Sequence, residues 1–210
     1  IQATKVSVQS SNLTTVRHWA EIKELISKSN LDSAVKDQSL QIFLQVASAE
    51  AKIHGRQLEQ VHFHEVGAID SIIDIVSVTI GLHQLNIKEI YSSPLPLGRT
   101  LGKSKNGNIP IPAPATLEIL RDVPIYGSQI QAELVTPTGA AIIKSYAKEF
   151  GAIPAMKIRK IGYGAGSRDL EIPNVLRIYI GEKVASTENA EDIVSIIAAN
   201  IDDMNPEFYE

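Results

Sequence analysis

The pattern of apolar and polar positions divides the chain into short strands and longer helices. Residues 3–9 alternate, which is typical of a strand, and shorter strand patterns follow at residues 90–93, 133–135 and 174–180. Apolar residues recur at helical spacing in five further segments. The helices predicted from them span about residues 19–29, 32–54, 68–85, 114–120 and 138–150. The pattern predicts an α+β fold with about five helices and six or seven short strands.

Proline and glycine separate these elements. Residues 102–108 are polar and basic, and we expect a loop there, followed by a proline-rich stretch without regular structure until the helix at Pro114. Gly102-Lys103-Ser104 lacks the preceding glycine of a P-loop. The glycines at 162, 164 and 166 do not have dinucleotide-binding spacing, and they favour a bulge or a close backbone approach.

A composition change near the C-terminal end predicts a domain boundary. Residues 182–191 are small and polar, as in a linker, whereas residues 193–198 again read as a strand. We therefore expect a first domain over residues 1–181, the linker, and the start of a second small α+β domain over residues 192–210. The opening residues lack an initiating methionine, and we expect them to lie inside a longer chain.

The densest group of potential metal ligands lies at residues 62–74. If residues 61–66 are extended, the imidazoles of His62 and His64 share one face, and Val61, Phe63 and Glu65 share the other. The helix that follows carries Asp70 and Asp74 on one face near its N-terminus, where negative charge is favoured. These side chains form a candidate site for nickel, zinc, copper or iron, or they are structural histidines and solvated carboxylates. His18, which precedes the first helix, is interpreted as a surface histidine.

Two other segments are candidate anion sites. A helix begins near Thr136, Thr138 and Gly139, and free N–H groups at such a terminus bind phosphate or carboxylate. The alternative is an ordinary hydroxyl cap, in which Thr136 or Thr138 satisfies its own helix. Arg168 follows the glycine-rich segment and is a further candidate anion ligand.

Composition narrows the function classes. The chain has 210 residues, a net charge of −4, 44% hydrophobic residues and no cysteine. The charge does not favour nucleic-acid binding or a polybasic membrane surface. The lack of cysteine excludes disulfides and thiolate ligands within the chain, so a metal ion must be held by nitrogen and oxygen. No apolar run reaches the length of a membrane span.

Several motifs together resemble the LarC family, the nickel insertion proteins of nickel-pincer cofactor biosynthesis. The first, His62-Phe63-His64-Glu65-Val66-Gly67-Ala68-Ile69-Asp70-Ser71, closely resembles the family's signature, and the motifs together make a specific match. The others follow in the family's order, and the matching segments are residues 62–76, 93–98, 110–116, 133–140, 161–166 and 200–207.

The resemblance implies a cytoplasmic enzyme, a lyase of the metal chelatase type, that uses CTP. Its reaction inserts nickel into pyridinium-3,5-bisthiocarboxylic acid mononucleotide and forms the cofactor of lactate racemase. Implied partners are this mononucleotide, CTP with Mg²⁺ or Mn²⁺, the apo lactate racemase and further copies of the chain. The family's histidine-rich stretch before the first helix is reduced here to His18.

The resemblance also implies residue roles. Nickel would be held by a subset of His62, His64, Glu65, Asp70 and Asp74. Glu65 is the candidate base for the ring proton that the Ni–C bond displaces, with a histidine as the alternative. The phosphate would bind near Thr136, Thr138, Gly139 and Arg168, and the nucleotide's cation near Asp202 and Asp203.

Two other functions remain open from the sequence. One is a non-catalytic domain that binds nickel and delivers it to a partner. The other is a nucleotide hydrolase that uses the acidic cluster at residues 202–207. Nickel binding without turnover favours the first, and CTP hydrolysis that is independent of nickel favours the second.

Overall fold

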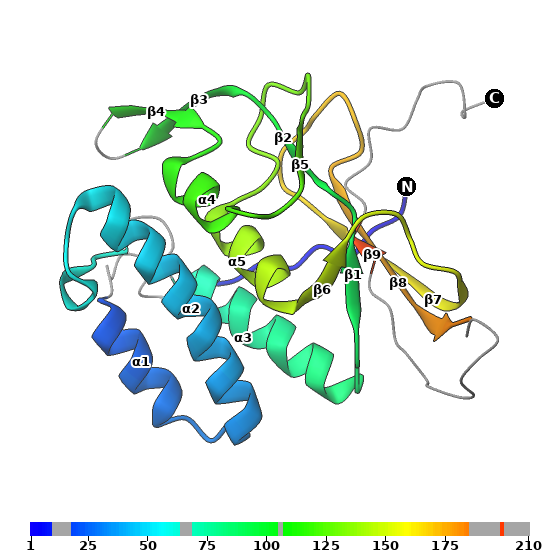
Figure 1. Cartoon of the computed structure of the whole chain (residues 1–210), viewed down its shortest axis with the longest axis horizontal. Coiled ribbons are helices and arrows are strands. Elements are labelled where there is room, and N and C mark those ends of the chain that lie inside the picture. The colour runs from blue at the N-terminus through cyan, green and yellow to red at the C-terminus, as the bar shows by residue number, and fades with distance from the viewer. Residues whose placement is uncertain (10–17, 64–68, 105–106, 185–197, 200–210) are drawn as a thin grey trace.

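The structure is a computed structural model that describes residues 1–9, 18–63, 69–104, 107–184 and 198–199. Helices gather on one side of the molecule and most strands on the other (Figure 1). This arrangement confirms the α+β class predicted from the sequence. Strand pairing divides the described strands into four small sheets rather than one large sheet.

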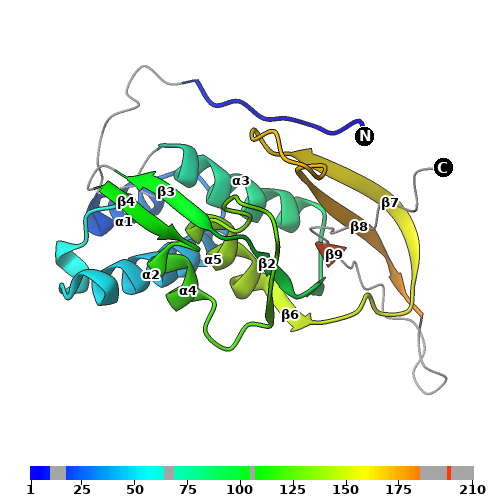
Figure 2. The ribbon, with the colours of Figure 1, turned by 90° about the horizontal axis from the view of Figure 1, so that it is seen from above.

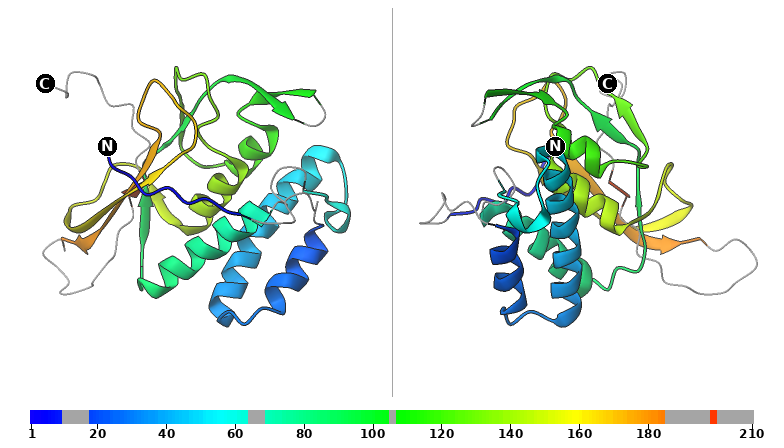
Figure 3. Two further views of the ribbon diagram at one scale, coloured as in Figure 1. Left: turned by 180° about the vertical axis from the view of Figure 1, so that it is seen from behind. Right: turned by 60° about the vertical axis from the view of Figure 1, so that its left-hand side comes forward.

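All five predicted helices are present among the described residues. Three of them, α1, α2 and α3, lie side by side, and two shorter helices, α4 and α5, pack on α2 (Figures 1 and 3). A 3-10 turn, η1, precedes the segment of His62. The helical elements are α1 (Trp19–Ser27), α2 (Ser33–His54), η1 (Leu58–Gln60), α3 (Ile69–Gln84), α4 (Pro114–Ile119) and α5 (Pro137–Tyr146).

The main hydrophobic core lies between these helices. Phe43 of α2 and Phe63, just after η1, are fully buried and meet edge to face. The long helix α2 ends at Gly55, which adopts the left-handed conformation (φ 59°) that glycine allows at a helix C-terminus. Other fully buried aliphatic residues of this core are Ile22, Ile42, Val46 and Ile75.

The strands form short pairs around the helices. The parallel sheet has the order β6-β1-β9, a second parallel pair is β2-β5, and the antiparallel pairs are β3-β4 and β7-β8. The β7-β8 ribbon lies at the end of the molecule away from α1 (Figure 2). The strands are β1 (Ile90–Ser92), β2 (Leu95–Leu97), β3 (Thr100–Ser104), β4 (Gly107–Ile111), β5 (Ile125–Gly127), β6 (Ala147–Phe150), β7 (Met156–Ala165), β8 (Val175–Lys183) and β9 (Ala198–Ala199).

Four sequence predictions about regular structure were wrong. The predicted loop at 102–108 is largely the β3-β4 hairpin. Pro110 is tolerated in it because an edge strand has N–H positions that donate no hydrogen bond to a neighbouring strand. The predicted strand at 133–135 is irregular. The fifth helix ends at Tyr146, since residues 147–150 pair with β1 as β6. Of residues 3–9, Thr4 alone forms a bridge, to Gly164.

The bulge expected in the glycine-rich segment lies slightly earlier. The β7-β8 register shifts between Ile158 and Lys160, before the first of the three glycines. The β8 strand continues to Lys183 and so enters the predicted linker, and β9 pairs with β1. Residues 185–197 and 200–210 lie outside the described part, so the division into two domains stays a prediction.

Candidate functional site

The described half of the histidine stretch meets the start of α1. Val61 and Phe63 are 3% and 1% exposed, whereas His62 between them is half-buried, so the predicted alternation is confirmed for residues 61–63. His62 pairs with His18 in an isolated antiparallel bridge, and the two imidazole centroids are 3.7 Å apart at an angle of 53°. His18 is therefore not the plain surface histidine that the sequence indicated.

The sequence gives no local sign of this contact, because 44 residues separate the two histidines. The contact arises from the packing of α1 beside η1, which sets the start of α1 next to the residue after Val61. His64 and Glu65, the next residues of the candidate metal site, lie outside the described residues. Their role as ligand and base stays a prediction.

The two aspartates lie at the start of α3. Asp70 is in the first turn and Asp74 follows one turn later, and both keep contact with solvent. Partial burial, and secondly the charge of Asp70, raise the pKa of the Asp74 carboxyl. A bound cation would offset this repulsion. Within the described residues, no three His, Asp or Glu side chains are grouped closely enough to hold a metal ion.

The N-terminus of α5 packs against that of α3. The Thr138 hydroxyl donates to the Ser71 hydroxyl at 3.5 Å, the long limit of a hydrogen bond, and both side chains are buried. The Thr136 hydroxyl accepts from the backbone N–H of Gly139 at 3.2 Å, which is the hydroxyl cap that the sequence left as an alternative. Two motifs that are 67 residues apart therefore meet here, with Gly139 exposed beside them.

Arg168 approaches the segment that leads into α5. Its guanidinium lies 3.6 Å from the carboxylate of Glu133, whose side chain is 15% exposed, whereas that of Arg168 is 58% exposed. Asn174 supports this turn, because its side-chain amide donates to the Arg168 carbonyl at 3.0 Å. The pairing places the Arg168 guanidinium beside the segment that precedes α5, with its charge balanced by Glu133. An anion there would compete with this carboxylate.

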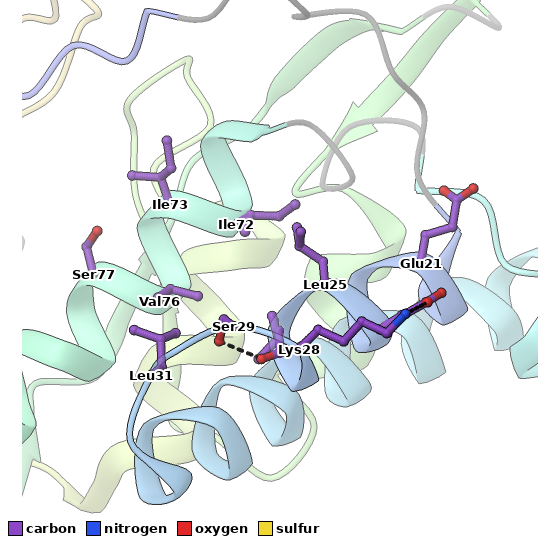
Figure 4. Close-up of a pocket in the computed structure, with 11 residues that line it drawn as sticks. Glu21, Leu25, Lys28, Ser29, Leu31, Ile72, Ile73, Val76 and Ser77 are labelled. Atoms are coloured by element: carbon purple, nitrogen blue, oxygen red, sulfur yellow. Dashed lines mark hydrogen bonds and ion pairs between the residues drawn. The ribbon is translucent and has the colours of Figure 1, made fainter.

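A groove of about 710 Å³ lies between α1 and α3. Leu25 of α1 faces Ile72 and Val76 of α3 across it, and charged residues stand at its edge (Figure 4). Its walls include Leu25, Ile26, Leu31, Ile72, Ile73 and Val76.

Asp202 and Asp203, the candidate ligands of the nucleotide's cation, lie outside the described residues. Among the described helices, none combines the length and the apolar character needed to cross a membrane.

Comparison with known proteins assigns the family. The model of the family described as nickel insertion protein matches residues 1–210. A protein of Desulfitobacterium hafniense named pyridinium-3,5-bisthiocarboxylic acid mononucleotide nickel insertion protein is 45% identical over 214 residues, which cover 100% of this chain and 53% of that protein. A Clostridium kluyveri protein of the same name is 50% identical over 194 residues, which cover 92% of this chain and 48% of that protein.

The chain thus spans about half the length of the curated relatives it matches. No solved structure matches it. The motifs found in the sequence, their convergence at the starts of α3 and α5, and the match along every residue lead to one conclusion: the chain belongs to the nickel insertion protein family.

Proposed function

We propose that this protein inserts nickel into pyridinium-3,5-bisthiocarboxylic acid mononucleotide, and that the domain predicted over residues 1–181 handles the metal and the substrate. The proposal is carried by the match of the whole chain to the nickel insertion family, together with relatives whose names state this substrate. The finer parts of the proposal are CTP dependence, classification as a lyase, a cytoplasmic location, and delivery of the product to lactate racemase. They rest on the motif resemblance.

The chemistry divides into three tasks. Nickel arrives on nitrogen and oxygen ligands from a subset of His62, His64, Glu65, Asp70 and Asp74, and it leaves when the two thiocarboxylate sulfurs of the substrate replace them. A Ni–C bond then forms at the pyridinium ring as the ring C–H bond breaks. Glu65 or a histidine accepts the proton, so that a dication enters and one proton departs.

The α5 N-terminus and Arg168 are proposed to hold the substrate phosphate. The N-terminus of α5 offers the positive end of a ten-residue helix, and the Gly139 N–H becomes available to a phosphate oxygen when the Thr136 hydroxyl releases it. The contact between Ser71 and Thr138 supports this placement, because it sets the phosphate site beside the helix that carries Asp70 and Asp74. Arg168 would exchange its contact with Glu133 for the phosphate. Asp202 and Asp203 are proposed to bind Mg²⁺ or Mn²⁺ with CTP.

A second candidate function is nickel binding and delivery without catalysis. It needs only the candidate metal ligands of residues 62–74 and no base for the ring proton. Under this alternative, the chain binds nickel but forms no nickel-carbon product, even when CTP and substrate are present. Analysis of the reaction mixture by mass spectrometry separates the two functions.

The first test is nickel-binding calorimetry with the wild type and the variant His62→Ala/His64→Ala. We expect the double variant to lose binding, because it removes two imidazole ligands. His83→Ala is the matched control, since His83 is an exposed histidine in the last turn of α3, at the opposite end from Asp70. Unchanged binding by the double variant would contradict the assignment of the metal to this stretch.

A further inference from the structure

The contact between His18 and His62 is a feature that the proposed function does not use. The imidazole centroids are 3.7 Å apart, and a backbone bridge joins the same two residues. We infer that His18 and His62 together form a bis-imidazole binding site for a nickel ion. This inference rests on the proposed function and deepens it, because it adds a ligand from outside the histidine motif.

The backbone of His18 is held in place. Its carbonyl accepts from the N–H groups of Glu21 and Ile22 at 3.0 and 3.1 Å, and its own N–H donates to the Glu21 carboxylate at 3.0 Å. The neighbouring Trp19 is 8% exposed and packs in the core. These contacts, with the capping box between His18 and Glu21, fix the position of His18 at the start of α1.

The backbone of His62 is fixed from the opposite direction. Val61 and Phe63 are buried on either side of it, so the alternation of an extended chain turns His62 toward α1. Two imidazoles presented from fixed backbones are preorganised for a shared ligand, since little further order is lost on binding. Metal–nitrogen bonds of about 2 Å place two ligand nitrogens about 3 Å apart when they bind at a right angle. The ring centroids are 3.7 Å apart, so the rings must turn and move slightly apart to bring one nitrogen of each to this separation.

The chemistry of the pair suits a transferred ion. Imidazole is a good ligand for nickel, and two neutral imidazoles leave most coordination positions open to water or to the substrate sulfurs. They also add no negative charge that would hold the dication. A site of this kind binds nickel and then releases it to a ligand that offers softer atoms.

The test measures nickel affinity in variants that separate ligation from structure. His18→Asn removes the imidazole but keeps a residue that caps helices well, and His62→Phe keeps a ring in the contact without a nitrogen. Even loss of an outer partner of a metal ligand lowers affinity about 10- to 100-fold, so we expect each variant to raise the Kd for Ni²⁺ at least about tenfold. His83→Ala is the control, and it should bind as the wild type does.

X-ray absorption of the Ni²⁺ complex gives a second readout that a merely structural role would not change. We expect the number of imidazole ligands to fall by one in His18→Asn. Thermal unfolding without metal checks that each variant is folded. A folded His18→Asn variant with the affinity and ligand number of the wild type would overturn the inference.

The same experiment distinguishes the inference from the proposed function. If His62→Ala/His64→Ala loses nickel while His18→Asn keeps it, the bis-imidazole site is wrong and the proposed metal stretch stands. If neither variant loses nickel, or if the wild type binds none, the bis-imidazole site and the assignment of the metal to residues 62–74 are both overturned.

Discussion

The edge-to-face contact between Phe43 and Phe63 is expected to hold the histidine segment against the core. The centroids of the two rings are 6.4 Å apart at 68°, and both side chains are fully buried. Such aromatic pairs contribute about 0.5–1.5 kcal/mol beyond the area that they bury. Replacement of either ring by leucine also changes the packing shape, which costs up to about 1.5 kcal/mol.

We therefore expect Phe43→Leu and Phe63→Leu each to lower the free energy of unfolding by about 1–3 kcal/mol. The double variant should lose less than the sum, with a coupling energy of about 0.5–1.5 kcal/mol. Urea unfolding followed by the fluorescence of Trp19 measures all four proteins, because this is the single tryptophan of the chain and it belongs to the same core.

A control cycle pairs Phe63→Leu with Phe150→Leu. Phe150 is a partly buried phenylalanine that packs on the same core, without a ring contact to Phe63 in the described structure. Its effect should add to that of Phe63→Leu within about 0.5 kcal/mol. Additive losses in the Phe43 cycle as well would refute the reasoning, since they would show that the rings contribute through burial alone.

Two further predictions concern a glycine and a carboxylate. A methyl group at Gly98 would lie 2.0 Å from the Ala132 carbonyl oxygen, so Gly98→Ala should lower the free energy of unfolding in urea by about 1–3 kcal/mol. Gly127→Ala is the control and should be close to neutral, because no atom lies within 4 Å of the added methyl group. Equal losses in the two variants would contradict the steric argument. Because its pKa is raised in the folded chain, the ionised Asp74 opposes folding above that pKa and the protonated form does not. Asp74→Asn should therefore raise the thermal midpoint of the metal-free protein at pH 7.5, and the gain should vanish near pH 3; a gain that is independent of pH would sink this explanation.

Helices were predicted well because their signals are local. The span of α2 and the glycine at its end are both readable within one segment, and the structure places both as expected. The strands were less predictable. Residues 147–150 carry the periodicity of the preceding helix, but pairing with β1 outweighs it, and such pairing depends on residues that are distant in sequence.

In the candidate site, too, local features were predictable from the sequence and long-range contacts were not. The sequence correctly indicated that Val61 and Phe63 face away from His62, since alternation is a local property. It gave no sign of the ring contact with His18 or of the hydroxyl contact between Ser71 and Thr138. Both contacts join elements through tertiary packing, and a single sequence carries no signal for a pairing of that kind.

The bridge between Thr4 and Gly164 has a consequence for how the protein is made. Its two hydrogen bonds join the Thr4 backbone to Tyr163 and Ala165, about 160 residues later in the chain. At a ribosomal rate of roughly 5–20 residues per second, the N-terminal segment waits about 10–30 s for this partner to be synthesised. This bridge therefore forms late, after the segments that make the helices have been synthesised.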